Sequence, residues 1–226
     1  MVERRFASVG EWAVDLEVLG LRERKKRDAL LRIKQASRRL FIERGYDRTT
    51  VRDVAAEANV GLGSIFRYAE NKADLLLMLF NEDHAEVTKI AFGSLDARLP
   101  FLDQAIAAFR HYYRYFAKNP QLSRSILRES TFYVPAGEAK LMTPARAGIQ
   151  QALEALVQAA RAKGEIVTSE SDAVITLLIF EIYQSESRRW LVENPENIEA
   201  GLSALRRALD MLAAGIAPKP PRAARH

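Results

Sequence analysis

The sequence predicts an all-α protein with an N-terminal three-helix domain and a larger C-terminal helical bundle. Strand signals are scarce, since we find no run of alternating β-branched residues and no Asn-Gly or Asp-Gly hairpin turn. Apolar residues instead recur at spacings of three and four along most of the chain. Charge separates the two parts: residues 22–72 hold 14 Lys/Arg against 7 Asp/Glu, whereas residues 73–226 hold 18 of each. A localised basic excess favours phosphate attraction, although charge alone leaves a merely solvated basic surface open.

Length and composition set the class of protein. The 226 residues are enough for a small domain plus a larger one, with a sizeable core. The absence of cysteine excludes a disulfide framework, a thiolate metal site and a cysteine nucleophile. The first 26 residues contain no apolar run long enough for a signal segment, and the longest apolar run, 173–180, is too short to span a bilayer. We therefore expect a cytoplasmic protein with no membrane partner.

The N-terminal domain begins with an amphipathic helix over residues 24–44. Its apolar face carries Ile33 and Leu40, and Gly45 follows as the usual C-terminal glycine. Thr50 has the position of an N-cap for a short helix ending at Ala58. Residues 59–61 then break the helix, and a second short helix is predicted over 62–68.

The rest of the chain reads as longer helices. Asn71 is a good N-cap for a helix that runs to about Ile90. Proline and glycine punctuation then predicts helices near 100–117, 120–132, 138–163, 170–193 and 196–214. The resulting domains are an uncertain extension over 1–20, a helix-turn-helix domain over 21–70, a helical domain over 71–217 and a disordered tail over 218–226.

Two short helices joined by a three-residue turn that contains glycine form a helix-turn-helix, whose second helix lies in the DNA major groove. Gly63 permits close backbone approach, Ser64 can hydrogen-bond a phosphate or base edge, and Arg67 can present a fork to guanine. Phe66 has no hydroxyl, so packing on the following helix is an equally open interpretation. The predicted DNA-binding residues are Thr49, Thr50, Gly63, Ser64, Phe66, Arg67, Tyr68 and Lys72.

The segment from Thr49 to Leu75, TTVRDVAAEANVGLGSIFRYAENKADL, resembles the DNA-binding segment of the TetR family of bacterial transcriptional regulators. The resemblance covers roughly residues 24–80, and beyond it only the helical architecture agrees. Gly61, Phe66 and Ala69 depart from the family pattern, which often has a serine cap, a phosphate-binding tyrosine and an aromatic there. The resemblance implies a homodimer on a palindromic double-stranded DNA operator, usually a repressor released by a small-molecule effector in the C-terminal domain.

An aromatic set in the C-terminal domain is the candidate effector site. Ordinary core packing is the alternative for each member, but together they can line a mostly apolar pocket with a few polar handles, which suits a largely apolar ligand. The predicted ligand-binding residues are Phe109, Tyr112, Tyr113, Phe116, Phe132, Tyr133, Phe180 and Tyr183.

The last predicted helix carries a heptad-like seam, with apolar residues spaced four, three, four and three. Together with the preceding helix, which is apolar on more than one face, it predicts a four-helix interface between two chains; packing inside one chain is the alternative. The predicted dimer-interface residues are Ile198, Leu202, Leu205, Leu209 and Leu212.

No catalytic constellation is found in the sequence. The three histidines, His84, His111 and His226, form no zinc-binding pair, and no phosphate-binding glycine loop occurs. The acidic residues around His84 are typical of a solvated helix face rather than a metal site. We therefore expect a non-enzyme with no cofactor and no metal. The alternatives are an all-helical enzyme with a DNA-binding appendage and a non-specific structural DNA-binding protein; operator, effector and sign of regulation stay open.

Overall fold

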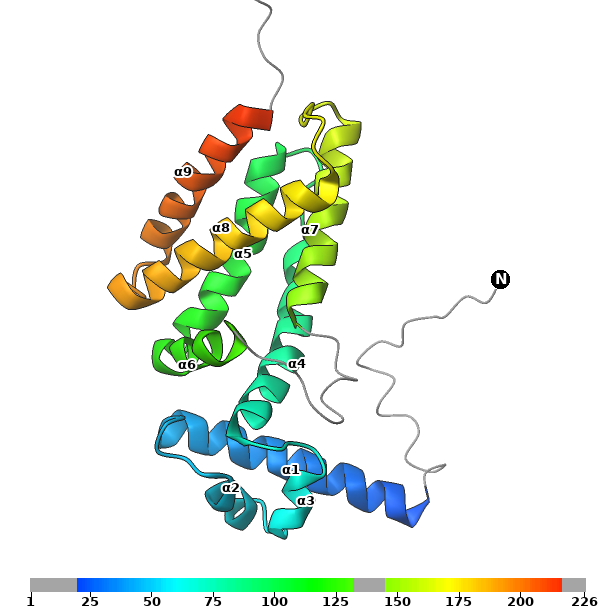
Figure 1. Cartoon of the computed structure of the whole chain (residues 1–226), viewed down its shortest axis with the longest axis vertical. Helices are drawn as coiled ribbons and strands as arrows, with labels where there is room; N and C mark the ends of the chain where they lie inside the picture. The colour runs from blue at the N-terminus through cyan, green and yellow to red at the C-terminus, as the bar shows by residue number, and fades with distance from the viewer. Residues whose placement is uncertain (1–19, 132–144, 217–226) are drawn as a thin grey trace, which may run out of the picture. The chain divides into compact units, whose positions relative to one another are not determined.

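The computed structural model describes residues 20–131 and 145–216, and all regular structure in these ranges is helical (Figure 1). The all-α prediction is therefore confirmed. The predicted extension over 1–20, except Gly20, the tail over 218–226, and Phe132 and Tyr133 of the predicted ligand set lie outside the described residues. The helices are α1 (Leu21–Glu43), α2 (Val51–Glu57), α3 (Leu62–Phe66), α4 (Lys72–Gly93), α5 (Phe101–Ala117), α6 (Pro120–Thr131), α7 (Ala145–Ala162), α8 (Asp172–Glu193) and α9 (Ile198–Ile216).

The chain divides into two compact units, Met1–Leu75 and Leu76–His226. The first unit thus ends at Leu75 rather than at residue 70, because the first turn of α4 is tied to it. Asn71 Oδ1 accepts from the Asp74 N–H at 3.0 Å, and the Asp74 carboxylate accepts from the N–H groups of Glu70 and Asn71 at 2.7 and 3.3 Å. This reciprocal cap fixes the start of α4 as the sequence predicted.

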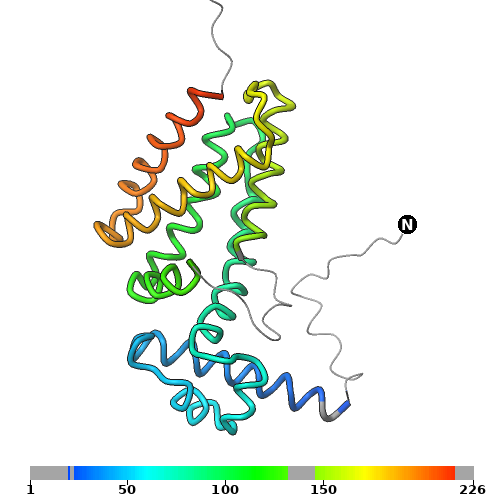
Figure 2. Tube along the Cα trace, viewed as in Figure 1, coloured from blue at the N-terminus to red at the C-terminus, as the bar shows by residue number. Residues whose placement is uncertain are grey.

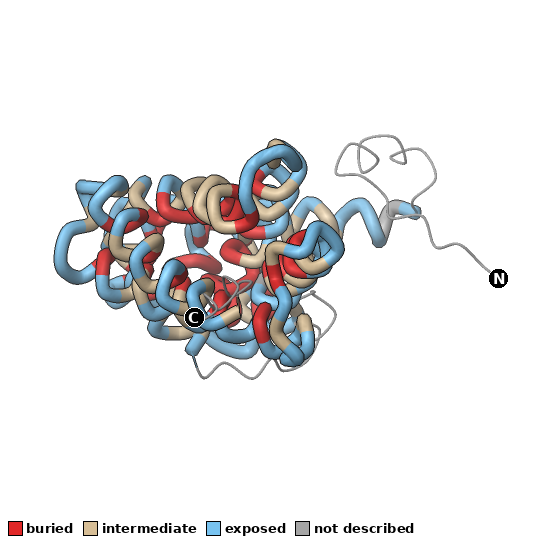
Figure 3. Tube along the Cα trace, turned by 90° about the horizontal axis from the view of Figure 1, so that it is seen from above, coloured by how far each residue is buried: buried red, intermediate tan, exposed pale blue. Residues whose placement is uncertain are grey.

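The first unit is a three-helix core. Ile33 and Leu40 of α1, Val54 of α2 and Ile65 of α3 are at most 2% exposed. α2 contacts both α1 and α3, so the two short helices are held by packing rather than by their own length. In Figure 3 buried positions alternate with exposed ones along the helices, as expected where one side of each helix is packed.

The second unit is built around α5, which contacts α6, α7, α8 and α9. Figure 2 shows α5 lying between α9 on one side and α7 on the other. α9 approaches closely at Gly201, where an added Cβ would lie 2.6 Å from ring atoms of both Tyr113 and Trp190. Only glycine fits this crossing without displacing two buried aromatic rings.

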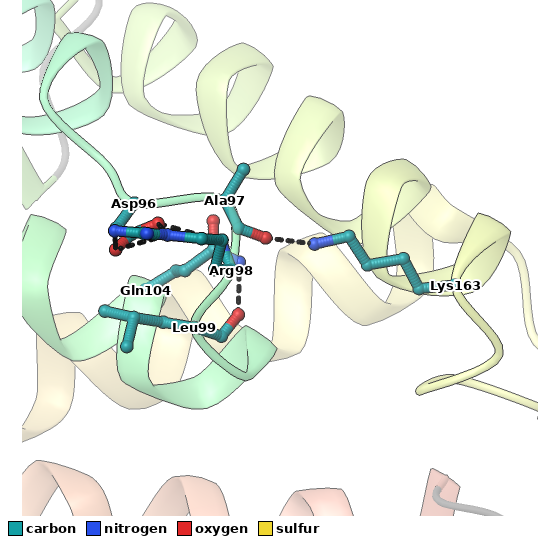
Figure 4. A network of polar contacts seen from close by, with 6 residues as sticks. All are labelled: Asp96, Ala97, Arg98, Leu99, Gln104 and Lys163. Carbon is teal, nitrogen blue, oxygen red and sulfur yellow. Dashed lines mark hydrogen bonds and ion pairs between the residues drawn. The ribbon is translucent and has the colours of Figure 1, made fainter.

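The loop between α4 and α5 is held by polar contacts (Figure 4). Arg98 Nε and Nη2 donate to the carboxylate of Asp96 at 2.8–3.2 Å, and Gln104 Nε2 donates to the Leu99 carbonyl at 2.7 Å. Lys163, just beyond α7, donates to the carbonyl of Ala97. Because Arg98 is exposed, its ion pair with Asp96 contributes more to the order of the loop than to the stability of the fold.

Candidate DNA-binding surface and ligand cavity

The N-terminus of α2 is fixed by a capping box. The Thr50 hydroxyl accepts from the Asp53 N–H at 3.1 Å, and the Asp53 carboxylate accepts from the Thr50 N–H at 2.8 Å. The Thr50 hydroxyl also donates to the Asp53 carboxylate at 2.6 Å, and this hydrogen bond, together with the one from the Thr50 N–H, lowers the pKa of Asp53. Thr50 is exposed, so this well-ordered helix start faces solvent.

The turn before α3 is as short as the sequence predicted. Asn59 adopts the left-handed conformation with φ 50°, and the N–H of Val60 donates to the Ala55 carbonyl at 3.0 Å. Asparagine is among the few residues that tolerate this conformation. The turn directs α3 so that Ile65 is buried against the other helices.

The opposite side of α3 is exposed. A Cβ added at Gly63 would meet no atom within 4 Å, so a backbone or phosphate can approach there. Phe66 is 50% exposed, and Arg67 is exposed, with no hydrogen bond or ion pair from its guanidinium to another described residue. Ser64 is half-buried beside them. These residues form a small surface with an apolar ring, a hydroxyl and a guanidinium.

Thr49 does not belong to this surface, so its predicted role is wrong. The side chain is 0% exposed, and its hydroxyl donates to the Gly45 carbonyl at 2.9 Å. Thr49 therefore stabilises the end of α1, where a carbonyl needs a donor, instead of contacting phosphate.

Tyr68 and Lys72 are also engaged inside the unit. The Tyr68 hydroxyl donates to the Lys26 carbonyl at 3.2 Å, which ties the end of α3 to α1. Lys72 Nζ donates to the carbonyls of Tyr46 at 2.8 Å and Asp47 at 3.3 Å and lies 4.2 Å from the Tyr46 ring centroid. An ammonium has three donors, so Lys72 keeps one for a phosphate, whereas the Tyr68 proton is already used.

Arg52 is a candidate that the sequence reasoning missed. It is exposed in the first turn of α2, two residues after Thr50, and its side chain makes no hydrogen bond or ion pair with another described residue. By contrast, Arg39 pairs with Glu57 and Arg48 donates to the Arg44 carbonyl at 2.8 Å. The position of Arg52 two residues after the predicted N-cap was a usable signal, because helix starts and nearby cations are frequent phosphate contacts.

The second unit contains a cavity of about 60 Å³. A single water needs roughly 10–15 Å³, so this space suits a few waters or a small group. Three predicted ligand residues, Phe116, Phe180 and Tyr183, lie in its wall. The other described wall residues are Phe80, His84, Leu127, Ser130, Arg146, Ile149, Gln184 and Ser187.

The other three described members of the ligand set lie in the core behind this wall. Phe109 stacks on Tyr183 with ring centroids 4.3 Å apart, and Tyr113 lies 4.6 Å from Trp190. The Tyr112 hydroxyl donates to Thr88 Oγ1 at 2.9 Å. Burial raises the pKa of Tyr112, and it raises that of Tyr113 to about 12. These three residues do not line the cavity, because α5 is surrounded by four helices and most of its aromatic side is core.

His84 is the buried polar residue in the cavity wall. It is 2% exposed, and neither ring nitrogen has a hydrogen-bond partner among the described residues. Its ring lies 3.9 Å from that of Phe80 and 5.6 Å from that of Phe116, measured between centroids. Burial lowers the pKa of His84 to about 3, so its ring is uncharged near neutral pH.

The predicted dimer seam lies inside the protomer. Leu202, Leu205 and Leu209 are 3%, 0% and 0% exposed, since α9 packs against α5 and α8, while Ile198 and Leu212 are half-buried. Leu202, Leu205 and Leu209 therefore pack within the chain and are not available to a partner, contrary to their prediction as interface residues. An amphipathic helix packed on its own domain produces the same spacing as a helix packed on a partner.

One exposed apolar surface of the second unit lies on α8. Val174, Leu177 and Leu178 are 39%, 46% and 44% exposed, and their spacing places them on one side of the helix. On α9, Met211 is 80% exposed.

No helix of the described residues has the length and apolarity needed to cross a bilayer. Within the same residues, no three His, Cys, Asp or Glu side chains gather where they could hold a metal ion. His84 is buried while Glu82 and Glu86 are exposed, so the acidic stretch of α4 does not converge on the imidazole.

The geometry defines a helix-turn-helix unit joined to a helical unit with an internal cavity, and comparison with known proteins agrees. Residues 33–79 match the sequence profile described as "Bacterial regulatory proteins, tetR family". A relative from Bacillus subtilis (strain 168), the uncharacterized HTH-type transcriptional regulator YhgD, is 32% identical over 98 residues. That match spans 43% of this chain and about half, 51%, of the relative. The predicted resemblance of the helix-turn-helix segment to the TetR family of bacterial transcriptional regulators is therefore confirmed over residues 33–79.

Solved structures share the fold over most of the chain. Thermus thermophilus FadR, a TetR-family transcriptional repressor in complex with lauroyl-CoA, has a TM-score of 0.69 at 20% identity, covering 86% of this chain and 98% of its own. The regulator FadR from Bacillus subtilis in complex with stearoyl-CoA has a TM-score of 0.61 at 19% identity, covering 83% and 99%. At these identities the likeness concerns the fold alone.

Proposed function

We propose that this protein is a transcriptional repressor that binds a palindromic operator as a homodimer in the cytoplasm and is released by a small, largely apolar ligand. The observation that carries the proposal is the free outer side of α3. Arg67 is exposed and unpaired among the described residues, beside Gly63 and Ser64, on a unit with an excess of positive charge. Such a helix suits the major groove, where an arginine can read guanine.

The homodimer is formed, in this proposal, by the exposed apolar side of α8 together with α9. Val174, Leu177 and Leu178 would otherwise keep a row of apolar side chains in water. A two-fold interface uses the same patch on both chains, and one helix pair from each chain closes a four-helix arrangement. A dimer also supplies the two recognition helices that a palindrome requires.

The effector enters the cavity of the second unit. Its wall is mostly aromatic and aliphatic, which favours a ligand with an apolar body. The cavity is small, so a larger ligand must displace wall side chains as it binds. Two proteins of similar fold carry lauroyl-CoA and stearoyl-CoA, which makes an acyl thioester the first class of effector to test.

Selection of bound sequences from random duplex DNA tests the proposal. The expected result is one palindromic consensus with half-sites about 34–36 Å apart, or a multiple of that spacing. Equal recovery of all sequences would instead support a non-specific structural DNA-binding protein. A turnover screen of the same preparation addresses the enzyme alternative, and mass spectrometry of the purified protein identifies a co-purifying ligand.

A further inference from the structure

The wall of the cavity contains a polar group whose hydrogen-bonding capacity is unused. His84 is 2% exposed, and both of its ring nitrogens lack a partner among the described residues. A buried polar group without a hydrogen bond destabilises a protein, so native structures rarely keep one without a use. The Ser187 hydroxyl is a second wall group without a partner among the described residues, whereas the Ser130 hydroxyl donates to the Leu127 carbonyl at 3.3 Å and Tyr115 donates to Asp83 at 3.0 Å.

The surroundings of His84 determine which chemistry it can bind. Its ring neighbours are Phe80, Tyr112, Tyr115 and Phe116, with centroids between 3.9 and 5.6 Å away. An uncharged imidazole offers one N–H donor and one acceptor nitrogen. It is therefore suited to a ligand oxygen that accepts or donates a hydrogen bond.

Charge is supplied elsewhere in the wall. Arg146 of α7 is the only charged side chain among the described wall residues, and it is half-exposed, paired with Glu181 and 5.1 Å from the Phe180 ring centroid. Asp83, next to His84 on α4, is held by Tyr115 of α5. An ionised carboxylate beside His84 would lose its water without gaining a counter-ion, which is costly in a buried site.

We propose that His84 is the polar anchor of the cavity and that it hydrogen-bonds an uncharged oxygen, a hydroxyl or a carbonyl, on an otherwise apolar ligand. This inference rests on the ligand-binding part of the proposed function and names the chemistry of that ligand. It predicts discrimination among molecules of one shape that differ only in the polar group. An acyl thioester satisfies it through its carbonyl, whereas a free ionised acid does not.

Three probes with the same methylphenyl body test the inference on the full-length protein: toluene, p-cresol and 4-methylbenzoate. Calorimetry should show the tightest binding for p-cresol. The variant His84→Phe keeps an aromatic ring against Phe80 and removes both nitrogens, so it should weaken p-cresol by about two- to tenfold and leave toluene unchanged or tighter. His111→Gln, which removes an imidazole that is not part of the cavity wall, is the control and should alter neither affinity.

A second readout needs no variant. The chain has only three histidines, so protein labelled with ¹⁵N-histidine gives few ring signals to assign. p-Cresol should shift the His84 ring nitrogens while the ring stays uncharged, and leave His226 unaffected. The inference is overturned if these signals do not respond, if His84→Phe binds p-cresol as wild type does, or if 4-methylbenzoate binds most tightly with a protonated His84.

These measurements use no DNA, so the two proposals can fail separately. If p-cresol binding depends on His84 but no operator is selected, the proposed role of His84 is supported and the proposed regulatory function is rejected. If a palindrome is selected but the His84 signals do not respond to p-cresol, the proposed DNA-binding function is supported and the proposed role of His84 is rejected.

Discussion

Single residues decide what the helix-turn-helix unit can offer to DNA. Thr49 and Thr50 are adjacent threonines. Thr49 is buried and its hydroxyl donates to the Gly45 carbonyl, whereas Thr50 is exposed and caps α2. The role of Thr50 could be predicted because an N-cap depends only on residues three positions away. The role of Thr49 could not, because it depends on how the loop after α1 folds back.

Arg67→Ala should weaken binding to the selected operator by about 1–3 kcal/mol and relax the base preference at one position of each half-site. Arg67 is the long exposed donor at the end of α3, and its side chain has no hydrogen bond or ion pair with another described residue, so the substitution should not disturb the fold. Arg52→Ala is the matched comparison: it should weaken all duplexes alike and lower the salt slope by about one unit. Competition binding against random duplex measures both, and an unchanged operator affinity for Arg67→Ala would remove it from base readout.

Acid sensitivity should be linked to His84. Folding lowers its pKa from 6.5 to about 3, so between these values the unfolded chain binds a proton that the folded protein does not. Stability contributed by the uncharged ring is therefore present above pH 6.5 and lost as pH falls, by roughly 2 kcal/mol at pH 5. Urea unfolding of wild type and His84→Phe at pH 7 and pH 5 measures this.

His84→Phe should lose less stability than wild type over this pH range, because it has no ring to protonate. His111→Gln, which removes a half-exposed imidazole from α5, is the control and should follow wild type. Parallel losses in wild type and His84→Phe would mean that the buried ring does not control the acid response.

At the scale of elements, helix positions could be predicted from the sequence far better than helix partners. N-cap residues such as Asn71 and helix-terminating glycines such as Gly45 act on their immediate neighbours in the chain, and they set where helices begin and end. The seam on α9 had the spacing of an interface, but Leu205 is fully buried within its own unit. Phe116 and Phe109 share a helix, yet only Phe116 reaches the cavity. Which side of a helix faces core, cavity or partner depends on tertiary packing that periodicity does not contain.

The double substitution Leu177→Glu and Leu178→Glu should convert the proposed dimer into a monomer while keeping the helical content. Both side chains are about half exposed in the protomer, so only a partner chain would be repelled. Leu205→Glu is the contrasting variant, and it should unfold the helical unit because the carboxylate would be buried. Light scattering with circular dichroism separates the two. A double variant that stays a full dimer would place the interface elsewhere.

At the scale of the whole molecule, α4 belongs to both units. Its first turn is hydrogen-bonded into the helix-turn-helix unit through Asp74 and Lys72, and further along it carries Phe80 and His84 of the cavity wall. A ligand that binds one arrangement of α4 better than another shifts the population of arrangements and with it the fit to the operator. We expect a coupling of about 1–3 kcal/mol between ligand and operator.

Linkage makes this coupling reciprocal, and a single pair of titrations tests it. The ligand identified by mass spectrometry of the purified protein is titrated into wild-type protein alone and into its complex with the selected operator. Operator DNA should weaken ligand binding by about 5- to 150-fold, the same factor by which the ligand weakens operator binding. Equal ligand affinity in the two titrations would mean that the cavity does not control DNA binding.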